Sequence, residues 1–349
     1  MDRNICIAVL GLGEMGTIHA ESLRRLGGVE LALASKRSEV LHELAERLYV
    51  PCALRFESYE DALASPRVDA VVVATAPADH TERIVRAAQA GKHIFCEKPL
   101  GLSAASVEKA LAQVEHARLE RGDFGKKVFM VGFMRRFDPA YARGKLLVQS
   151  GALGKPTVLK CTSGDAEYPA KYQRDLGYNS MLLDLAVHDI DLARWLLGAE
   201  VHRVHVVCRS LVYPQLAGLG DADNALALLE MDSGALVSAH FCRAFNYGYN
   251  VTSELVCERG SVYLGELKRP GDAVRVADPA GALSERIAPV FRERFEQAFQ
   301  REMEVFAEAV RKGTLPAGAP GPLDGLAATR VAEALVRSWQ TGSPQVVQH

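Results

Sequence analysis

The first third of the chain alternates between two hydrophobic patterns, one typical of buried strands and one of amphipathic helices. Residues 4–10 form a nearly continuous apolar run, as a strand covered on both faces requires, and helical periodicity then covers about 15–27. The alternation continues through predicted strands at 29–35, 68–75, 93–96 and 127–133 and predicted helices at 38–48 and 79–90. Because its strands alternate with helices, this region predicts a parallel, doubly wound α/β sheet.

The pattern changes in the second part of the chain, where short strands are joined by tight turns. Residues 224–231 and 235–245 flank Asp232-Ser233-Gly234, and residues 251–257 and 261–266 flank Glu258-Arg259-Gly260. Such pairs are typical of antiparallel hairpins. Helical patterns at 292–312 and 323–339 close the chain. We therefore predict a C-terminal α+β domain with an open, mainly antiparallel sheet.

Length and composition agree with two globular domains. The 349 residues exceed the roughly 250 to 300 at which a single core stops growing. Apolar residues make up 48% and charged residues 24%, which excludes a disordered or fibrous chain. We expect one domain at 1–130 and a second, for substrate binding and oligomerisation, at 131–349.

Charge and cysteine content limit the partners and the compartment. The 41 Lys and Arg balance the 43 Asp and Glu, so we expect a small-molecule ligand and neither nucleic acid nor a membrane as partner. No apolar run approaches the ~18 residues of a membrane span. The seven cysteines include no Cys-x-x-Cys pair, which favours reduced thiols and a cytoplasmic protein. We expect no metal site, because His202 and His205 lie three apart on a strand and face opposite sides.

A glycine-rich segment follows the first predicted strand and opens the first helix. Gly11, Gly13 and Gly16 match the G-x-G-x-x-G pattern, with Glu14 and Met15 in the variable positions. Gly11 permits the tight turn, Gly13 lets the backbone approach a pyrophosphate, and Gly16 allows close packing of helix on strand. A merely glycine-rich turn is the alternative, but the strand and helix on either side favour a Rossmann dinucleotide-binding domain.

The end of the second predicted strand indicates which dinucleotide is used. NAD-preferring domains place an acidic residue there, whereas this chain has Ser35, Lys36 and Arg37, which suit a 2′-phosphate. We therefore predict NADP. The alternative is that the two cations simply begin a solvated helix, which leaves NAD or both cofactors usable. Further cofactor-binding positions are expected at Thr75, Pro77, His80, Glu97 and Lys98.

A polar stripe marks a helix in the second part. At about 100° per residue, Asp184, His188, Asp191 and Trp195 fall on one side, opposite a stripe of leucines. A solvent-facing stripe is the alternative, although Trp195 makes it less favourable because large aromatic side chains seek cover. We interpret His188 as a general base, with Asp184 orienting its imidazole.

Three segments resemble the Gfo/Idh/MocA oxidoreductases, and their order and spacing match over nearly the whole chain. They are Glu97-Lys98-Pro99, the string Gly-Phe-Met-Arg-Arg-Phe-Asp at 132–138, and the Asp-x-x-x-His-Asp-x-Asp pattern at 184–191. The string at 132–138 is most similar to the inositol dehydrogenase branch. The resemblance implies that Lys98 is catalytic and that the peptide bond after it is often cis. It also nominates Tyr247, in Tyr-Gly-Tyr, as a substrate ligand.

The resemblance implies the reaction and the assembly. We expect an NAD(P)-dependent dehydrogenase that oxidises a ring secondary alcohol of a cyclic polyol or sugar to a ketone, and a homotetramer packed through the open sheet. Either Arg135 or Arg136 is expected to face the substrate, and we assign Arg135 to substrate binding. Residues 160–163 lack a histidine that inositol dehydrogenases tend to carry, so we expect the pocket to read a different pattern of substrate hydroxyls. A glycosidase with a retained dinucleotide and a non-catalytic, dinucleotide-sensing regulator are the alternatives, the latter disfavoured by the presence of Lys98 and His188.

Overall fold

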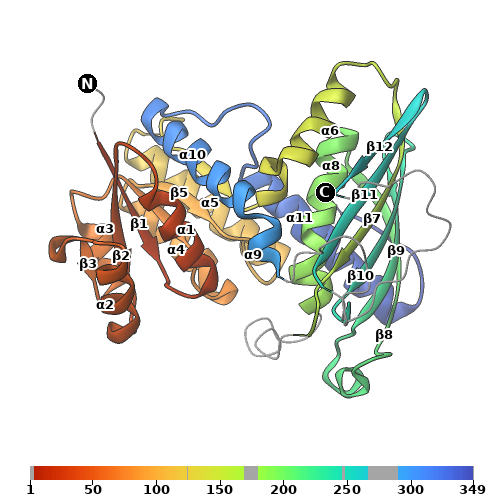
Figure 1. Ribbon diagram of the computed structural model, residues 1–349, viewed down its shortest axis with the longest axis horizontal. Coiled ribbons are helices and arrows are strands. Elements are labelled where there is room, and N and C mark those ends of the chain that lie inside the picture. Colours follow the sequence, from red (N-terminus) through yellow and green to blue (C-terminus); the bar gives the residue numbers. More distant parts are fainter. Residues whose placement is uncertain (1–3, 124, 169–179, 246–247, 266–289, 349) are drawn as a thin grey trace. The chain divides into compact units, whose positions relative to one another are not determined.

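The computed structural model describes residues 4–123, 125–168, 180–245, 248–265 and 290–348. The chain forms two compact units (Figure 1). Unit 1 comprises residues 1–137 and 297–326, and unit 2 comprises residues 138–296 and 327–349. Within the described residues, no helix has the length and apolar character needed to cross a membrane.

Unit 1 contains a six-stranded parallel sheet in the order β3-β2-β1-β4-β5-β6. Its strands are β1 (Ile5–Leu10), β2 (Val29–Ala34), β3 (Arg55–Phe56), β4 (Ala70–Val73), β5 (His93–Cys96) and β6 (Phe129–Val131). Its helices are α1 (Glu14–Arg24), α2 (Ser38–Arg47), α3 (Tyr59–Ala64), α4 (Pro77–Gln89) and α5 (Ala104–Glu120), with short 3₁₀ turns at Cys52–Leu54 and Met134–Phe137. The predicted doubly wound sheet is confirmed.

The core of this sheet follows from its sequence. Every residue of β1, β4 and β5 is buried, as expected of strands covered on both faces. The strand order reverses at β1, where β2 pairs on one side and β4 on the other. In doubly wound sheets this switch point is where ligands bind, outside the carboxyl ends of the strands.

Unit 1 also includes a segment that the sequence places in the second domain. The helix α10 (Glu296–Lys312) contributes residues from Gln297 onward to unit 1. Its apolar face is buried, with the ring of Phe306 5.6 Å from that of Phe95 on β5. The predicted division at 130 is therefore close to the observed one at Phe137, but 297–326 returns to unit 1 because the core under β5 needs this helix.

Unit 2 contains a seven-stranded mixed sheet in the order β12-β11-β7-β10-β9-β8-β13, in which only the β7–β10 pair is parallel. Its strands are β7 (Pro156–Gly164), β8 (Val201–Arg209), β9 (Asn224–Met231), β10 (Leu236–Cys242), β11 (Asn250–Cys257), β12 (Gly260–Leu264) and β13 (Gln345–Val346). Its helices are α6 (Pro139–Gln149), α8 (Ala186–Leu197) and α9 (Phe291–Arg294), with a 3₁₀ turn at Pro214–Leu219, and α11 (Pro322–Thr341) begins in unit 1 and continues here. Both predicted hairpins are confirmed, as β9–β10 and β11–β12.

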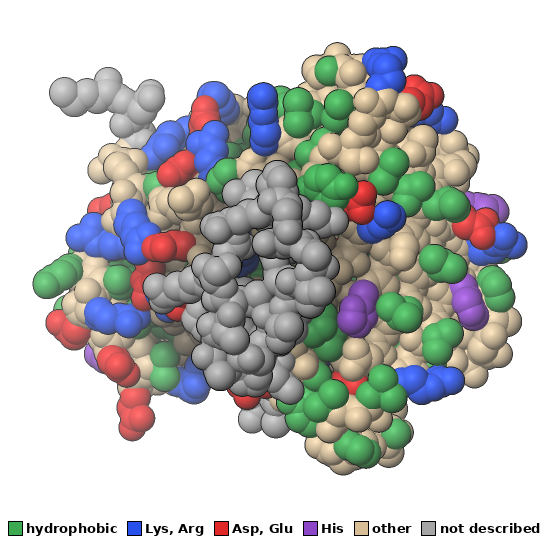
Figure 2. Space-filling model, turned by 45° about the vertical axis from the view of Figure 1, so that its right-hand side comes forward, with side chains coloured by type: hydrophobic (Ala, Val, Ile, Leu, Met, Phe, Trp, Pro, Cys, Tyr) green, Lys and Arg blue, Asp and Glu red, His purple; other side chains and the backbone are tan. Residues whose placement is uncertain are grey.

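One face of this sheet is buried and the other is open. Along β9, residues at alternate positions are buried, whereas Leu226 and Leu228 between them are 64% and 60% exposed. Leu236 on β10 is 51% exposed. Figure 2 shows hydrophobic and histidine side chains gathered on an open face of the molecule. The helix α8 packs against β7 and β10 of the sheet.

The helix that carries His188 does not begin as a regular α-helix. A π-helical turn covers Met181–Leu185 and passes directly into α8, which ends at Gly198 in the left-handed conformation (φ 64°). Because a π turn contains more residues than an α turn, the uniform rotation of 100° per residue is wrong for Asp184. Within the stripe, His188 and Asp191 are buried and Asp184 and Trp195 are partly buried, so the polar stripe is not a solvent-facing surface.

Candidate functional site

The glycine loop between β1 and α1 fits an anionic ligand. Gly11 has a φ of +91°, and a Cβ there would lie 2.7 Å from the carbonyl oxygen of Ala74. A Cβ on Gly16 would lie 1.8 Å from the carbonyl oxygen of Gly11. Gly13 precedes α1 without a side-chain cap, and a Cβ there would meet nothing within 4 Å. The exposed backbone at Gly13 and the first turn of α1 therefore form a cradle that suits a pyrophosphate.

The residues after β2 lie beside this loop. The Ser35 side chain is buried, and its Oγ accepts a hydrogen bond of 3.1 Å from the Arg37 backbone N–H. The Arg37 guanidinium donates to the carbonyl oxygen of Leu12 at 3.4 Å, which links it to the glycine loop. The Lys36 ammonium lies 5.6 Å from the centre of the Tyr59 ring. Two cations thus sit at the end of β2, as the sequence predicts.

His80 fixes the start of α4 to the Lys98 turn. Its Nδ1 lies 2.8 Å from the carbonyl oxygen of Pro99 and its Nε2 lies 3.1 Å from that of Thr75. Burial lowers the pKa of His80, so the imidazole is neutral and donates to one carbonyl at a time. Pro77 occupies the first turn of α4. These contacts give His80 a structural task, and its predicted contact with the cofactor stays a prediction.

Lys98 is half-buried at the carboxyl end of β5, and its peptide bond to Pro99 is cis. Its backbone N–H donates to the Glu97 carboxylate at 3.1 Å. The other oxygen of Glu97 lies 2.6 Å from Nε2 of His19 on α1. Glu97 is therefore a buried support for the lysine turn, and its predicted contact with the cofactor stays a prediction.

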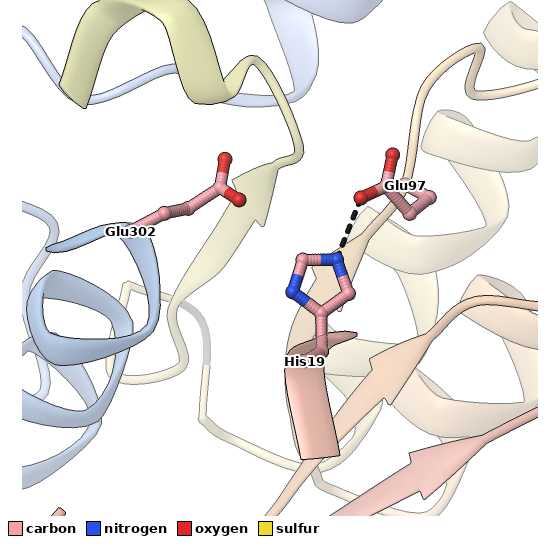
Figure 3. A group of neighbouring side chains, drawn as sticks. All are labelled: His19, Glu97 and Glu302. Atoms are coloured by element: carbon pink, nitrogen blue, oxygen red, sulfur yellow. Dashed lines mark hydrogen bonds and ion pairs between the residues drawn. The ribbon is translucent and has the colours of Figure 1, made fainter. Parts of the chain in front are cut away.

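Glu302 of α10 reaches toward the His19–Glu97 pair (Figure 3). All three side chains are buried, and their donor atoms lie within 4.8 Å of one another. Within the described residues, this is the one group with the spacing of a metal site. Nε2 of His19 is occupied by its hydrogen bond to Glu97, and we assign no metal here.

The two arginines after β6 are distinguished by their contacts. The Arg136 guanidinium forms a 3.0 Å ion pair with Asp324 and donates to the carbonyl oxygen of Gly318. Arg136 therefore has a structural role, and the assignment of Arg135 to the substrate stays a prediction. Arg135 is 1% exposed and remains the candidate substrate ligand.

In unit 2, Asp184 lies next to an arginine that the sequence does not nominate. Arg243 follows β10 and is fully buried, and it donates 3.0 Å hydrogen bonds to Asp184 and to Asp165. Asp184 is thus held as one of two carboxylates around a guanidinium. Its expected role in orienting His188, which follows four residues later and is 6% exposed, stays a prediction.

Other buried polar groups support this region. Asp189 accepts a 2.6 Å hydrogen bond from the Ser163 hydroxyl on β7, which explains a carboxylate on the apolar side of the helix. Asp221 accepts hydrogen bonds from Ser180 and from the Tyr168 hydroxyl. Neither Arg243 nor Asp221 belongs to a recognisable sequence motif, so their roles in this region become apparent only from the three-dimensional contacts. Tyr247 lies outside the described residues.

Two family models match the chain. The oxidoreductase family with an NAD-binding Rossmann fold matches residues 5–120, and the GFO/IDH/MocA C-terminal domain matches residues 141–263.

Individual relatives agree with these matches. The chain is 34% identical to a myo-inositol 2-dehydrogenase of Thermotoga maritima, over 89% of this chain and 90% of that protein. It is 35% identical to an NAD(+)-dependent scyllo-inositol 2-dehydrogenase of Bacillus subtilis, over 90% and 89%. Among solved structures, the Lactobacillus casei scyllo-inositol dehydrogenase with bound NAD(H) and scyllo-inositol superposes with a TM-score of 0.84 at 28% identity, covering 99% of both chains.

Proposed function

The chain belongs to the Gfo/Idh/MocA oxidoreductase family, and on this basis we propose that it oxidises a ring hydroxyl of an inositol-like cyclic polyol to a ketone. The proposal rests on a glycine cradle shaped for a pyrophosphate, in a chain that also carries the family's lysine and histidine, Lys98 and His188. The relatives named for inositol oxidation support the substrate class. The expected alternatives, a glycosidase and a regulator, have no comparable support among these observations.

Each catalytic residue has a separate task in this reaction. Oxidation removes a hydride and a proton from the alcohol, and the nicotinamide supplies the hydride acceptor when it is bound. We assign the proton to an imidazole nitrogen of His188, acting as a general base. Lys98 places an ammonium at the carboxyl end of β5, where it can stabilise the developing alkoxide. Asp184 supplies a fixed negative charge, because Arg243 holds its carboxylate in place.

Substrate recognition is assigned to Arg135 and Tyr247. A buried guanidinium can donate several hydrogen bonds to hydroxyl oxygens, which suits a polyol. A tyrosine hydroxyl can both donate and accept, so it can pair with any ring hydroxyl. Arg135→Met and Tyr247→Phe should each raise KM for the polyol more than they lower kcat.

We propose that NADP is preferred over NAD. The argument is the presence of Lys36 and Arg37, with no carboxylate at the end of β2, and the Arg37 guanidinium beside the glycine loop. Ser35→Asp should reverse the preference, because a carboxylate repels the 2′-phosphate and accepts hydrogen bonds from a 2′-hydroxyl. A wild-type preference for NAD above about tenfold in kcat/KM, or ~1.4 kcal/mol, would contradict the charge argument.

The decisive assay is a panel of inositols, aldoses and linear polyols with each cofactor, followed by the absorbance of the reduced nicotinamide. We expect myo- or scyllo-inositol to be oxidised faster than any linear polyol. Turnover of added cofactor also separates a dehydrogenase from a glycosidase that retains its dinucleotide. Fast oxidation of a linear substrate without inositol activity would reject the proposed substrate class.

We further propose a cytoplasmic homotetramer in which the open sheet face of unit 2 packs on another copy. Leu226, Leu228 and Leu236 expose a large apolar area on adjacent strands, and isolated chains rarely leave such patches uncovered. Leu228→Glu should lower the mass measured by light scattering while the circular dichroism spectrum is retained. Six of the seven free cysteines are buried thiols, which is consistent with a reducing compartment.

A further inference from the structure

The buried cluster of His19, Glu97 and Glu302 contains a carboxyl group that the proposed reaction does not use. Glu302 is 0% exposed, and neither of its oxygens has a hydrogen-bond partner among the described residues. The rings of Phe95 and Phe299 lie 5.1 and 6.1 Å from the His19 ring, so the surroundings are apolar. A charged carboxylate without a donor is unfavourable in such a place.

The neighbouring groups also oppose a charge on Glu302. Burial, and then the negative charge of Glu97, raise the pKa of Glu302 well above its usual value. From β5 the Cys96 thiol lies close to Glu97, and burial raises its pKa too, so it stays neutral. Burial without a donor and the nearby charge of Glu97 therefore both favour a proton on Glu302.

Three polar atoms of the cluster remain to be satisfied. Nδ1 of His19 and both oxygens of Glu302 are buried and make no hydrogen bond to the described part of the chain. Figure 3 shows Glu302 extending toward the side of the imidazole that bears Nδ1. One ligand atom from each of the three side chains lies within 4.8 Å of the other two. A water molecule between the Glu302 acid and Nδ1 of His19 would satisfy both groups.

We propose that Glu302 is a positioning residue for the Lys98 turn: as a neutral acid bridged by water to Nδ1 of His19, it keeps the hydrogen of that ring on Nε2. Nε2 then donates to Glu97 at 2.6 Å, and Glu97 accepts from the Lys98 backbone N–H at 3.1 Å. The chain of contacts runs from α10 through α1 to the end of β5. The effect of this chain of contacts on catalysis rests on the function proposed for Lys98. The proposed protonation states of Glu302 and His19 do not depend on that function.

Protonation is tested first, without any substrate. The infrared difference spectrum between the wild type and Glu302→Gln at neutral pH should show the carbonyl band of a protonated carboxylic acid. Nitrogen NMR of the histidine rings, with His19→Gln for assignment, should show His19 neutral with its hydrogen on Nε2. A missing acid band, or a cationic His19 ring between two carboxylates, would overturn the proposal.

Activity then tests the positioning role. Glu302→Gln should keep kcat close to the wild-type value, because glutamine is neutral and can still donate a hydrogen bond. Glu302→Ala should lower kcat about tenfold, which is the effect of one lost buried hydrogen bond. The KM for the dinucleotide should change little. Glu308→Gln is the matched control, because Glu308 lies on the same helix in an exposed pair with Lys312. An unchanged kcat in a folded Glu302→Ala would refute the role. If Glu302→Ala does not fold, the infrared band of the protonated acid decides whether the proposal stands. A wild-type protein that is inactive on every polyol would count against the proposed function alone.

Discussion

Replacing Gly13 by alanine should weaken dinucleotide binding while leaving the fold intact. Gly13 has an ordinary φ of −78°, which an alanine adopts without strain. The added methyl group would meet no protein atom within 4 Å. Since this position precedes a helix, where glycine and alanine differ by no more than about 1 kcal/mol, the free energy of unfolding should change little.

Binding should respond much more strongly than stability. A pyrophosphate that approaches the loop would contact the new methyl group and lose hydrogen bonds from the first turn of α1. Hydrogen bonds to a charged group contribute about 1.5 to 3 kcal/mol, so the Kd should rise about 10- to 100-fold. Gly16→Ala should behave differently: its Cβ would lie 1.8 Å from a backbone oxygen, so the backbone must move and stability should also fall by about 1 to 3 kcal/mol.

The measurement is a fluorescence titration with NADP and with NAD, together with urea unfolding, for both variants and for Gly27→Ala. Gly27 is an exposed position in the same unit where an added Cβ also meets nothing within 4 Å, so its variant should match the wild type in both assays. A Gly13→Ala protein that binds both dinucleotides with wild-type affinity would refute the assignment of this loop to the pyrophosphate.

Three further outcomes follow from single contacts. If His188 is the general base, oxidation should rise with pH as its imidazole loses a proton. His188→Ala should then lower kcat/KM by about 10² to 10⁴ and abolish this rise, whereas a rise that persists would point to another base. Arg243→Met should lower the free energy of unfolding by about 3 kcal/mol in urea, because Asp184 keeps a partly buried charge, and an unchanged midpoint would contradict this. Burial, and then nearby cations, lower the pKa of His93 from its usual 6.5 to about 4. The unfolded state therefore binds a proton on His93 more readily than the folded state does. The free energy of unfolding should be highest above pH ~6.5 and fall by about 3 kcal/mol toward pH 4. His93→Asn should reduce this fall, whereas the exposed His116→Asn should not.

The elements that the sequence predicts well are those whose burial repeats regularly along the chain. The strand β1 is buried at every position and the strand β9 at every second position, so the apolar pattern reports both the strand and its environment. The glycine loop is predicted equally well, because the positions of Gly11 and Gly16 have no space for a larger residue.

Other features depend on contacts between distant residues, which leave no periodic trace. The strand β3 is only two residues long, so it has no sequence pattern of its own and is defined by its pairing with β2. The helix α10 has a clear apolar face, but nothing in that face states which core it covers. Arg243 meets Asp184 across 59 residues of sequence, and an isolated arginine at the end of a strand ordinarily faces solvent.

The two units neutralise their buried carboxyl groups by different means, and this difference decides which group can serve the reaction. Asp184 forms a 3.0 Å ion pair with the guanidinium of Arg243, which has no exposed surface, so the ionised form of the carboxylate is favoured. Glu302 has no cation beside it among the described residues and is held neutral instead. An ionised carboxylate can favour an imidazolium formed when His188 takes a proton, whereas a neutral acid offers hydrogen bonds but no charge. Asp184 therefore suits the chemical step, and Glu302 suits the support of a turn.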